Sequence, residues 1–508
     1  MNNSTTLSTS DRDPFKKVGI IPSGESILAE LDIDPTEIKS IKTRYQACQY
    51  RAVVNWLTKY RPESNSSNLG KVKGLLETFY HLSTIDAWQA AGKVCLMHLD
   101  TPTQENLYEQ LRTWGYYQEL IKIYNRLLGK LDSDLEIIWL RGLGTIYCFL
   151  GQYEKAINYH QMQFNIAKKI GQKEAEGTAI GGMGIAYRSL GQYQKAIDCH
   201  QRQLVIAHEI QNREIAAYAL GGIGLVYEAL GQYKKAIDSH HKQLLIVQET
   251  GNKREVAGAL ANLGLAYEAL GQYPTAIDYY NKGLQISQEV GYRSAEATTL
   301  MNLGNTYDTL GKVQVASECY QKALVIVRAT GERELEGSVL NGLGNIHSNL
   351  GDYHRANEYH HKSLAIAREI NDRRGEGCSL ANLGSIYYYL EQYKAAIDYY
   401  QQSLVITREI GDLEGEGCVL SNLGDTLAKI EQYSEAIQYC QASLKICHQI
   451  HDGLGEATVL YNLATIYQKI NRDACAYEYC DRALTLATEL SIPLAKECQT
   501  LKEKLEDE

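Results

Sequence analysis

Hydrophobic and polar positions recur along this chain with a fixed period of forty residues. Within residues 377–411 the side chains of Leu380, Leu383 and Tyr387 fall at steps of three and four, which places them on one face of a helix. The same register returns without an insertion from about residue 135 to 490. Leu383 recurs as Leu143, Met183, Ile223, Leu263, Leu303, Leu343, Leu423 and Leu463. Such a period is typical of a stacked repeat array.

Each forty-residue unit is predicted to contain two antiparallel helices. The second helix has its own apolar stripe, which includes Ala396 and Tyr400. Between the helices lies a turn signal, in its fullest form Gly191 followed by Gln192 and Tyr193. Glycine suits this place because it adopts the left-handed backbone conformation that ends many helices. One such hairpin cannot bury both stripes, so we expect neighbouring hairpins to stack.

The turn signal changes in the last repeats. Glu391, Glu431 and Asn471 take the place of the turn glycine. These residue types resist the left-handed conformation more than glycine does. The sequence therefore predicts a looser turn near the C-terminus, within the same fold.

The column pattern resembles the tetratricopeptide repeat in its forty-residue variety, over about seventy per cent of the chain. The residues that carry this resemblance are Leu380, Leu383, Gly384, Tyr387, Tyr393, Ala396 and Tyr400. The resemblance implies an all-α fold, a right-handed superhelical solenoid of stacked helix hairpins. It also implies that the first helix of each hairpin lines the concave surface.

The composition divides the chain into four parts. Residues 1–40 are predicted to be a disordered or weakly ordered arm, with a short apolar cluster in 25–40. Residues 41–134 hold helical patterns out of register, residues 135–490 hold nine repeats, and residues 491–508 are expected to form a capping helix. The arm is expected to dock on the chain; the alternative is a pseudo-ligand that folds into the groove.

The region 41–134 contains two segments that look like decayed hairpins. One is marked by Leu82 and Trp88, the other by Gly115 and Tyr117. The region also resembles the helical connector that precedes such arrays in bacterial proteins with signalling ATPase domains. The phosphate-binding motif of those ATPases is absent from the sequence.

Charge and cysteine content narrow the class of protein. The formal net charge of −10 argues against a nonspecific nucleic-acid binder, which is usually basic. The 12 cysteines lie scattered through predicted helices, and the sequence has neither a signal-peptide pattern nor a long apolar run. We therefore expect a reduced, cytoplasmic protein without membrane insertion.

The histidines and cysteines, which could bind a metal or act in catalysis, are more simply interpreted as packing residues. His160, His200, His240 and His360 share one column, but Tyr280 occupies it elsewhere, so the column is predicted to pack. Copies one repeat apart lie roughly 10 Å from each other, which is too far to share a metal ion. The cysteines lack metal-ligand spacing. The sequence therefore predicts no catalytic residues, no metal site and no cofactor.

Some polar columns are not required by a hydrophobic core. Asparagine precedes the core leucine in five repeats, and another asparagine column lies one turn further along. The resemblance implies that an asparagine at position 382 grips the backbone of a bound peptide, and an amide both donates and accepts hydrogen bonds. The alternative is that these amides link adjacent helices. The predicted groove residues are Asn262, Asn302, Asn305, Asn345, Asn382, Asn422, Asn462, Tyr388, Tyr389 and Tyr461.

A column of cations lies where the first helices begin. Its predicted members are Arg213, Lys253, Arg293, Arg333 and Arg373. They either form a basic edge that selects acidic peptides or pair with glutamates three residues later, such as Glu336 after Arg333. The two interpretations are compatible, because an exposed ion pair is weak.

The sequence favours a scaffold or adaptor that binds a peptide segment of a partner protein. Its motifs look closer to spindle-orientation adaptors and kinesin light chains than to receptors for chaperone tails. The alternative is a peptide-responsive sensor that resembles bacterial peptide-pheromone receptors, with residues 41–130 as its effector region. The sequence leaves the partner and the oligomeric state open.

Overall fold

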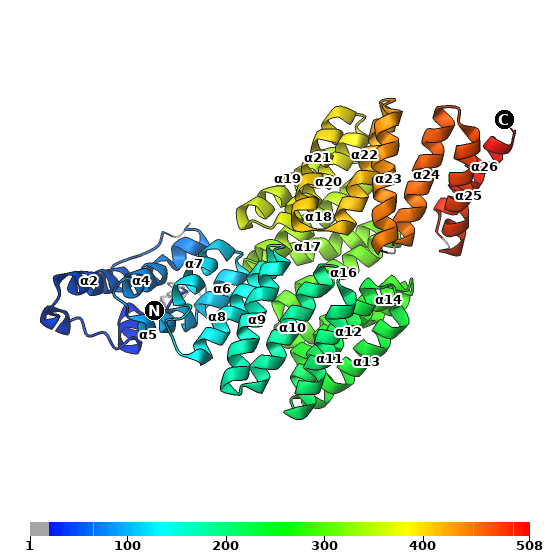
Figure 1. Cartoon of the computed structure of the whole chain (residues 1–508). Helices are drawn as coiled ribbons and strands as arrows, with labels where there is room; N and C mark the ends of the chain where they lie inside the picture. The colour runs from blue at the N-terminus through cyan, green and yellow to red at the C-terminus, as the bar shows by residue number, and fades with distance from the viewer. Residues whose placement is uncertain (1–19, 64–65, 451, 491, 508) are drawn as a thin grey trace, which may run out of the picture. The chain divides into compact units, whose positions relative to one another are not determined.

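The computed structural model describes residues 20–63, 66–450, 452–490 and 492–507, and the regular elements in these ranges are helices (Figure 1). The predicted all-α class is confirmed. The chain divides into two compact units, Met1–Leu131 and Asp132–Glu508.

The first unit contains short helices around its own core. Its helices are α1 (Gly24–Glu30), the 3₁₀-helix η1 (Glu37–Ser40), α2 (Arg44–Thr58), α3 (Asn68–Lys71), α4 (Lys73–Thr84), α5 (Trp88–Leu96), α6 (Leu107–Thr113) and α7 (Tyr117–Leu127). Phe79, Leu82 and Leu111 are fully buried in it. The two segments described as decayed hairpins form the pairs α4–α5 and α6–α7, and Gly115 turns the second pair with a φ of 78°.

The predicted N-terminal arm lies partly outside the described residues, which begin at residue 20. From Gly24 onward the arm forms α1 and η1. Ile27 and Leu28 of α1 are buried, and α1 packs on α2 within the first unit. This apolar cluster is therefore occupied by packing in its own unit.

The second unit is an array of hairpins. Its helices are α8 (Ser133–Phe149), α9 (Tyr153–Ile170), α10 (Lys173–Ser189), α11 (Tyr193–Glu209), α12 (Arg213–Ala229), α13 (Tyr233–Thr250), α14 (Lys253–Ala269), α15 (Tyr273–Glu289), α16 (Arg293–Thr309), α17 (Val313–Thr330), α18 (Arg333–Asn349), α19 (Tyr353–Ile370), α20 (Arg373–Tyr389), α21 (Tyr393–Ile410), α22 (Leu413–Lys429), α23 (Tyr433–Ile450), α24 (Gly453–Lys469), α25 (Asp473–Glu489) and α26 (Leu494–Asp507). Each even-numbered helix from α8 to α24 pairs with the helix after it, so the described residues form nine hairpins.

The predicted core columns are buried. In the second helices the alanine column is 0% exposed in all nine repeats: Ala156, Ala196, Ala236, Ala276, Ala316, Ala356, Ala396, Ala436 and Ala476. Alanine fits here because a larger side chain would push the paired helices apart. In α26, Cys498, Leu501 and Leu505 cover the last hairpin. Ser491, predicted to open this cap, lies outside the described residues.

The turns within the hairpins have one geometry throughout, which corrects the prediction of looser C-terminal turns. Gly191 has a φ of 69°, and Glu391 and Glu431 adopt nearly the same conformation with φ values of 59° and 61°. The closing hydrogen bond is also kept: the backbone N–H of Gln192 donates to Tyr187 at 2.9 Å, and that of Gln392 donates to Tyr387 at 2.9 Å. The late turns are therefore strained but not loosened.

The array curves toward its first helices. Consecutive first helices, such as α10 and α12 or α18 and α20, contact each other directly, whereas each second helix packs mainly on first helices. Closer spacing in one layer places that layer on the inside of the curve. The first helices therefore line the concave face of the second unit, as the sequence predicts.

The array also touches itself across six repeats. A Cβ atom added at Gly151, in the turn of the first hairpin, would lie 3.2 Å from Cβ of Ile410, where α21 ends. Burial raises the pKa of Tyr193 in the second turn, and the carboxylate of Glu414 in α22 raises it further. We name this meeting of Gly151, Tyr193, Ile410 and Glu414 the return contact. It joins the first two hairpins to the seventh and eighth.

Candidate functional site

The concave face is shaped by aromatic side chains that insert from the second helices between the first helices. A Cβ atom added at Gly144 in α8 would lie 2.5 Å from Nε2 of His160, and one added at Gly182 in α10 would lie 2.5 Å from Cε1 of the same ring. His160 thus occupies a window between two glycines. His200 fits the same way between Gly184 and Gly222. The glycines are needed because the ring takes the space of their missing side chains.

The inserted rings carry polar tips that meet the first helices. Tyr280 donates a hydrogen bond of 2.7 Å to Oε2 of Glu268 in α14, and Nε2 of His240 lies 3.0 Å from Oε1 of Glu228 in α12. The hydroxyl of Tyr320 donates to Oδ1 of Asn305 in α16. The histidine column is therefore buried and hydrogen-bonded in the packing role that the sequence predicts.

Apart from Asn305, which accepts from Tyr320, the predicted asparagine ladder divides into two groups. In the first group the amides bond or pack within the chain: Asn262 donates to Gln243 at 3.2 Å, Asn462 donates to Ser421 at 3.3 Å, and Asn302 is only 7% exposed. These contacts match the alternative that the amides link adjacent helices.

The second group offers its amides to solvent. Asn345 on α18 is exposed, Asn382 on α20 is half-buried, and neither has a hydrogen-bond partner within the described ranges. Asn422 on α22 makes only a long contact, 3.9 Å from its Nδ2 to Sγ of Cys418. We name Asn345, Asn382 and Asn422 the amide patch. It spans three consecutive first helices.

The predicted tyrosines lie near the amide patch but differ in access. Tyr389 is 57% exposed and stacks on Tyr353, with the ring centroids 5.6 Å apart. Tyr388 donates a hydrogen bond of 2.5 Å to Asp425 of the next first helix, which holds it in place. Tyr461 is partly buried against the cluster under α26. Tyr389 is therefore the most accessible of the three.

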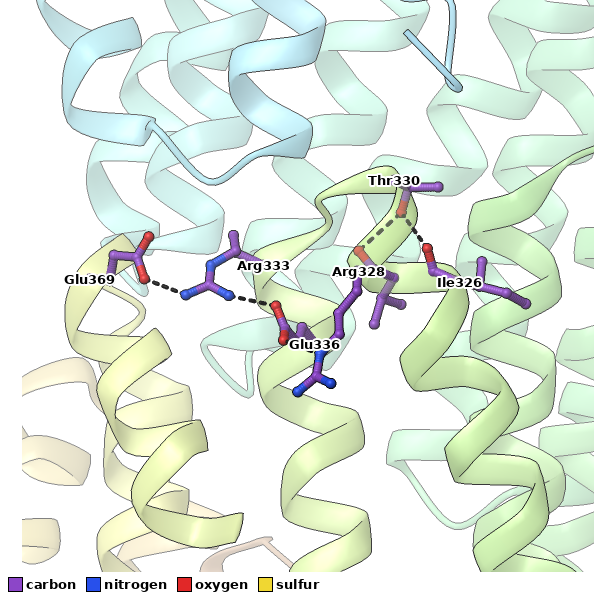
Figure 2. Close-up of polar contacts among 7 residues, drawn as sticks. Ile326, Arg328, Thr330, Arg333, Glu336 and Glu369 are labelled. Atoms are coloured by element: carbon purple, nitrogen blue, oxygen red, sulfur yellow. Dashed lines mark hydrogen bonds and ion pairs between the residues drawn. The ribbon is translucent and has the colours of Figure 1, made fainter. Parts of the chain in front are cut away.

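The predicted basic edge is paired within the chain. Arg333 donates to Glu336 in its own helix and to Glu369 at the end of α19, and Arg328 donates to Glu336 at 2.9 Å (Figure 2). Arg373 repeats this arrangement with Glu376 and Glu409. The other members form the pairs Arg213–Glu249, Lys253–Glu289 and Arg293–Glu296.

These ion pairs favour local pairing over a basic edge as the role of this column of cations. The pairing three residues along is present, as expected, and a second glutamate joins from the end of the neighbouring second helix. A cation already bound to two carboxylates attracts an acidic peptide weakly. The column therefore joins the start of the first helix to the end of the second helix within one hairpin, as in Arg333–Glu369 and Arg373–Glu409, and its charge is largely paired.

A comparison with models of protein families identifies the family of this chain. The model of the tetratricopeptide repeat matches residues 134–207, 176–242, 214–289, 255–329, 335–409 and 415–489. The chain belongs to the tetratricopeptide-repeat family. This assignment supports a role in protein interaction, and the tetratricopeptide fold is typically non-catalytic. A comparison with curated protein sequences finds no match.

Solved structures resemble this tetratricopeptide protein at low identity and with TM-scores below 0.5. A Rap protein complexed with competence and sporulation factor is 13% identical, with a TM-score of 0.47, over 77% of this chain and 99% of that one. The apo quorum sensor NprR from B. thuringiensis is 17% identical, with a TM-score of 0.46, over 75% of this chain and 99% of that one. A signal transduction ATPase with a tetratricopeptide-repeat sensor from Pyrococcus horikoshii is 15% identical, with a TM-score of 0.47, over 96% and 75%.

The concave face of this tetratricopeptide protein also holds residues that the sequence does not predict. Ile185 and Leu265 are 47% and 36% exposed, and Leu225 between them is half-buried. They occupy the column of Asn305 and Asn345 in earlier repeats. The forty-residue register places these three residues in one column. An apolar residue on a helix is usually assigned to the core, so only the polar members of this column are predicted to line the groove.

Two further observations complete the description of the tetratricopeptide chain. Among the described residues no helix has both the length and the hydropathy to cross a membrane. The cysteines are free thiols, and burial raises the pKa of Cys440 to about 12. Such buried thiols are poor nucleophiles, because the thiolate is the reactive form.

Proposed function

We propose that the array binds a segment of another protein along its concave face, as a scaffold or adaptor. The amide patch is the observation that supports this proposal. Asn345, Asn382 and Asn422 lie on three consecutive first helices and contribute little to the core. Asparagine is a weaker helix former than alanine, so its presence at these positions carries a cost that packing does not explain. A peptide backbone would satisfy both ends of each amide.

The exposed ring of Tyr389 adds an apolar contact beside the patch. Tyrosine binds with a small loss of side-chain entropy because it has few rotatable bonds. A segment that crosses α18, α20 and α22 would therefore meet three amides and the ring of Tyr389. This composition suits recognition of a backbone together with a few side chains.

The first prediction concerns the amide patch. We expect the double variant Asn382→Ala with Asn422→Ala to raise the Kd for a bound peptide about tenfold or more, because each lost hydrogen bond contributes about 1 kcal/mol. The ligand is identified by capture on the full chain followed by peptide mapping, and the Kd of the mapped peptide is measured by fluorescence anisotropy.

The control for this experiment is Asn165→Ala, on the exposed surface of the second helix α9. It should leave the Kd unchanged, and all variants should keep the helical circular dichroism of the parent. An unaltered Kd in the double variant would remove the amide patch from the proposal.

A second function is favoured by the division of the chain into two units. In a peptide-responsive sensor the array binds the peptide and the first unit acts on a target. Deletion of residues 1–131 distinguishes the two functions in cells. An adaptor keeps its binding and its cellular effect, whereas a sensor keeps binding but loses its output.

A further inference from the structure

The concave face of repeats two to four differs in chemistry from the amide patch. Ile185 on α10, Leu225 on α12 and Leu265 on α14 occupy one helical position in three consecutive first helices, and we name them the apolar strip. In the next three repeats this position holds Asn305, Asn345 and Ser385. The face therefore changes from apolar to polar between α14 and α16.

The apolar strip is accessible because its neighbours are small. Gly181 and Gly182 precede Ile185, and Gly221 and Gly222 precede Leu225. Gly182 and Gly222 are required by the inserted rings of His160 and His200. The same packing that inserts the rings thus leaves no side chain that would cover the strip on that flank.

A row of carboxylates follows the strip three residues further along. Its members are Glu228 on α12, Glu268 on α14 and Asp308 on α16. Glu228 faces His240 at 3.0 Å, Glu268 accepts from Tyr280 at 2.7 Å, and Asp308 accepts from Asn349 at 3.2 Å. In the described part of the chain none of the three forms an ion pair with a lysine or arginine.

Arg188 on α10 occupies the same column; burial lowers its pKa and the carboxylate of Glu228 raises it, so Glu228 has one cation nearby. Glu268 and Asp308 are the members of the row that are short of positive charge. Burial raises the pKa of Glu268, and its hydrogen bonds from Tyr280 and Thr306 offset this in part. A cation from outside the chain would supply the missing charge. The cations at the start of the first helices contrast with this row, because Arg333 and Arg373 are each paired with two glutamates. The charge that lacks a lysine or arginine partner is thus negative at Glu268 and Asp308.

We propose that the apolar strip and the carboxylate row together select a partner segment that carries apolar side chains interleaved with lysine or arginine. The inference rests on the proposed function and reverses the acidic partner that the basic-edge interpretation of the sequence left open. Neighbouring helices pack roughly 10 Å apart, and a segment in the polyproline II conformation advances about 3.1 Å per residue with three residues per turn. An apolar side chain at every third residue would therefore meet Ile185, Leu225 and Leu265 in turn.

The test is selection from a phage-displayed library of random peptides, long enough to cross three repeats, on the full-length protein. The enriched peptides should combine apolar residues with lysine or arginine. We expect their Kd to rise about tenfold or more in Ile185→Ser with Leu265→Ser, and likewise in Glu228→Gln with Glu268→Gln. Leu245→Ser is the matched control, because Leu245 is 60% exposed on the second helix α13.

The outcomes separate this inference from the proposed function. Enriched peptides that are acidic, or that bind both double variants as tightly as the parent, overturn the inference. If the same peptides lose affinity in Asn382→Ala with Asn422→Ala, the proposed function stands without it. If no peptide is enriched, or if binding is unchanged in all three double variants, both are overturned.

Discussion

At the scale of single residues, the glycines of the first helices have two different roles. Gly182 lies against the ring of His160, with no room for a Cβ atom. Gly258 in α14 is exposed, and a Cβ atom added there would meet nothing within 4 Å. Glycine weakens a helix relative to alanine. The first glycine is therefore required by packing, whereas the second only costs stability.

We predict opposite effects for the same substitution at these two sites. Gly182→Ala should lower the free energy of unfolding by about 1–3 kcal/mol, because the new methyl group overpacks the His160 window. Gly258→Ala should raise it by up to about 1 kcal/mol through helix propensity. Urea unfolding measures both. Equal effects at the two positions would contradict the window.

Because the inserted histidines are buried, their contribution to the stability of the fold depends on pH. Burial and the neighbouring His361 lower the pKa of His360 from 6.5 to about 4. The folded state thus binds fewer protons than the unfolded state between these values. The contribution of His360 to stability is complete above about pH 6.5 and is lost as the pH falls toward 4.

We predict that the chain loses about 2 kcal/mol of stability from His360 alone between pH 7 and about pH 5. His360→Tyr should remove this part of the loss, because Tyr320 and Tyr400 occupy the same column and an added hydroxyl would lie near Asn345 as that of Tyr320 lies near Asn305. Urea unfolding of both proteins at the two pH values is the measurement. An unchanged pH dependence in the variant would assign the loss to other groups.

At the scale of helices and turns, the last repeats keep their geometry despite their residues. Glu391, Glu431 and Asn471 adopt the left-handed conformation with φ values of 59°, 61° and 55°. The helices before and after each turn fix where the chain enters and leaves it, so the backbone of the turn cannot relax. The strain stays in the backbone, where it costs about 1–2 kcal/mol for each residue.

We predict that Glu391→Gly and Glu431→Gly each raise the free energy of unfolding by about 1 kcal/mol. The matched control is Gly191→Ala, where φ is 69° and an added Cβ would meet nothing within 4 Å, so only backbone strain changes. It should lower stability by a similar amount. Thermal or urea unfolding that ranks the three variants otherwise would mean that the glutamate side chains stabilise the turns.

At the scale of the whole molecule, the sequence predicts the array and its buried columns. Columns such as Ala396 and Leu383 are predictable because each repeat buries them in the same way. The pairing of Arg333 with Glu369 is harder to predict, since the partners lie 36 positions apart and meet only when α18 and α19 fold into a hairpin. The docking of Ile27 and Leu28 is not predictable in this way, because the first unit is irregular and its burial pattern does not repeat.

The asparagine ladder shows that contacts between helices are hard to predict even within a single column. Asn262 and Asn382 are equivalent in sequence, yet the first bonds to Gln243 and the second faces solvent. The difference comes from the preceding second helix, which offers Gln243 in one repeat and Ser363 in the other. The column of a residue therefore predicts its position in the repeat, whereas the neighbouring side chains determine whether it has a hydrogen-bond partner.

The return contact gives the array a mechanical property that a simple solenoid lacks. In an ordinary solenoid each repeat touches only its neighbours, so it extends under load like a soft spring. Here Gly151 lies against Ile410, six repeats further along, so tension on the two ends of the array first loads that contact. The array should therefore resist small forces as a closed coil, and extend as a spring only after the contact has broken.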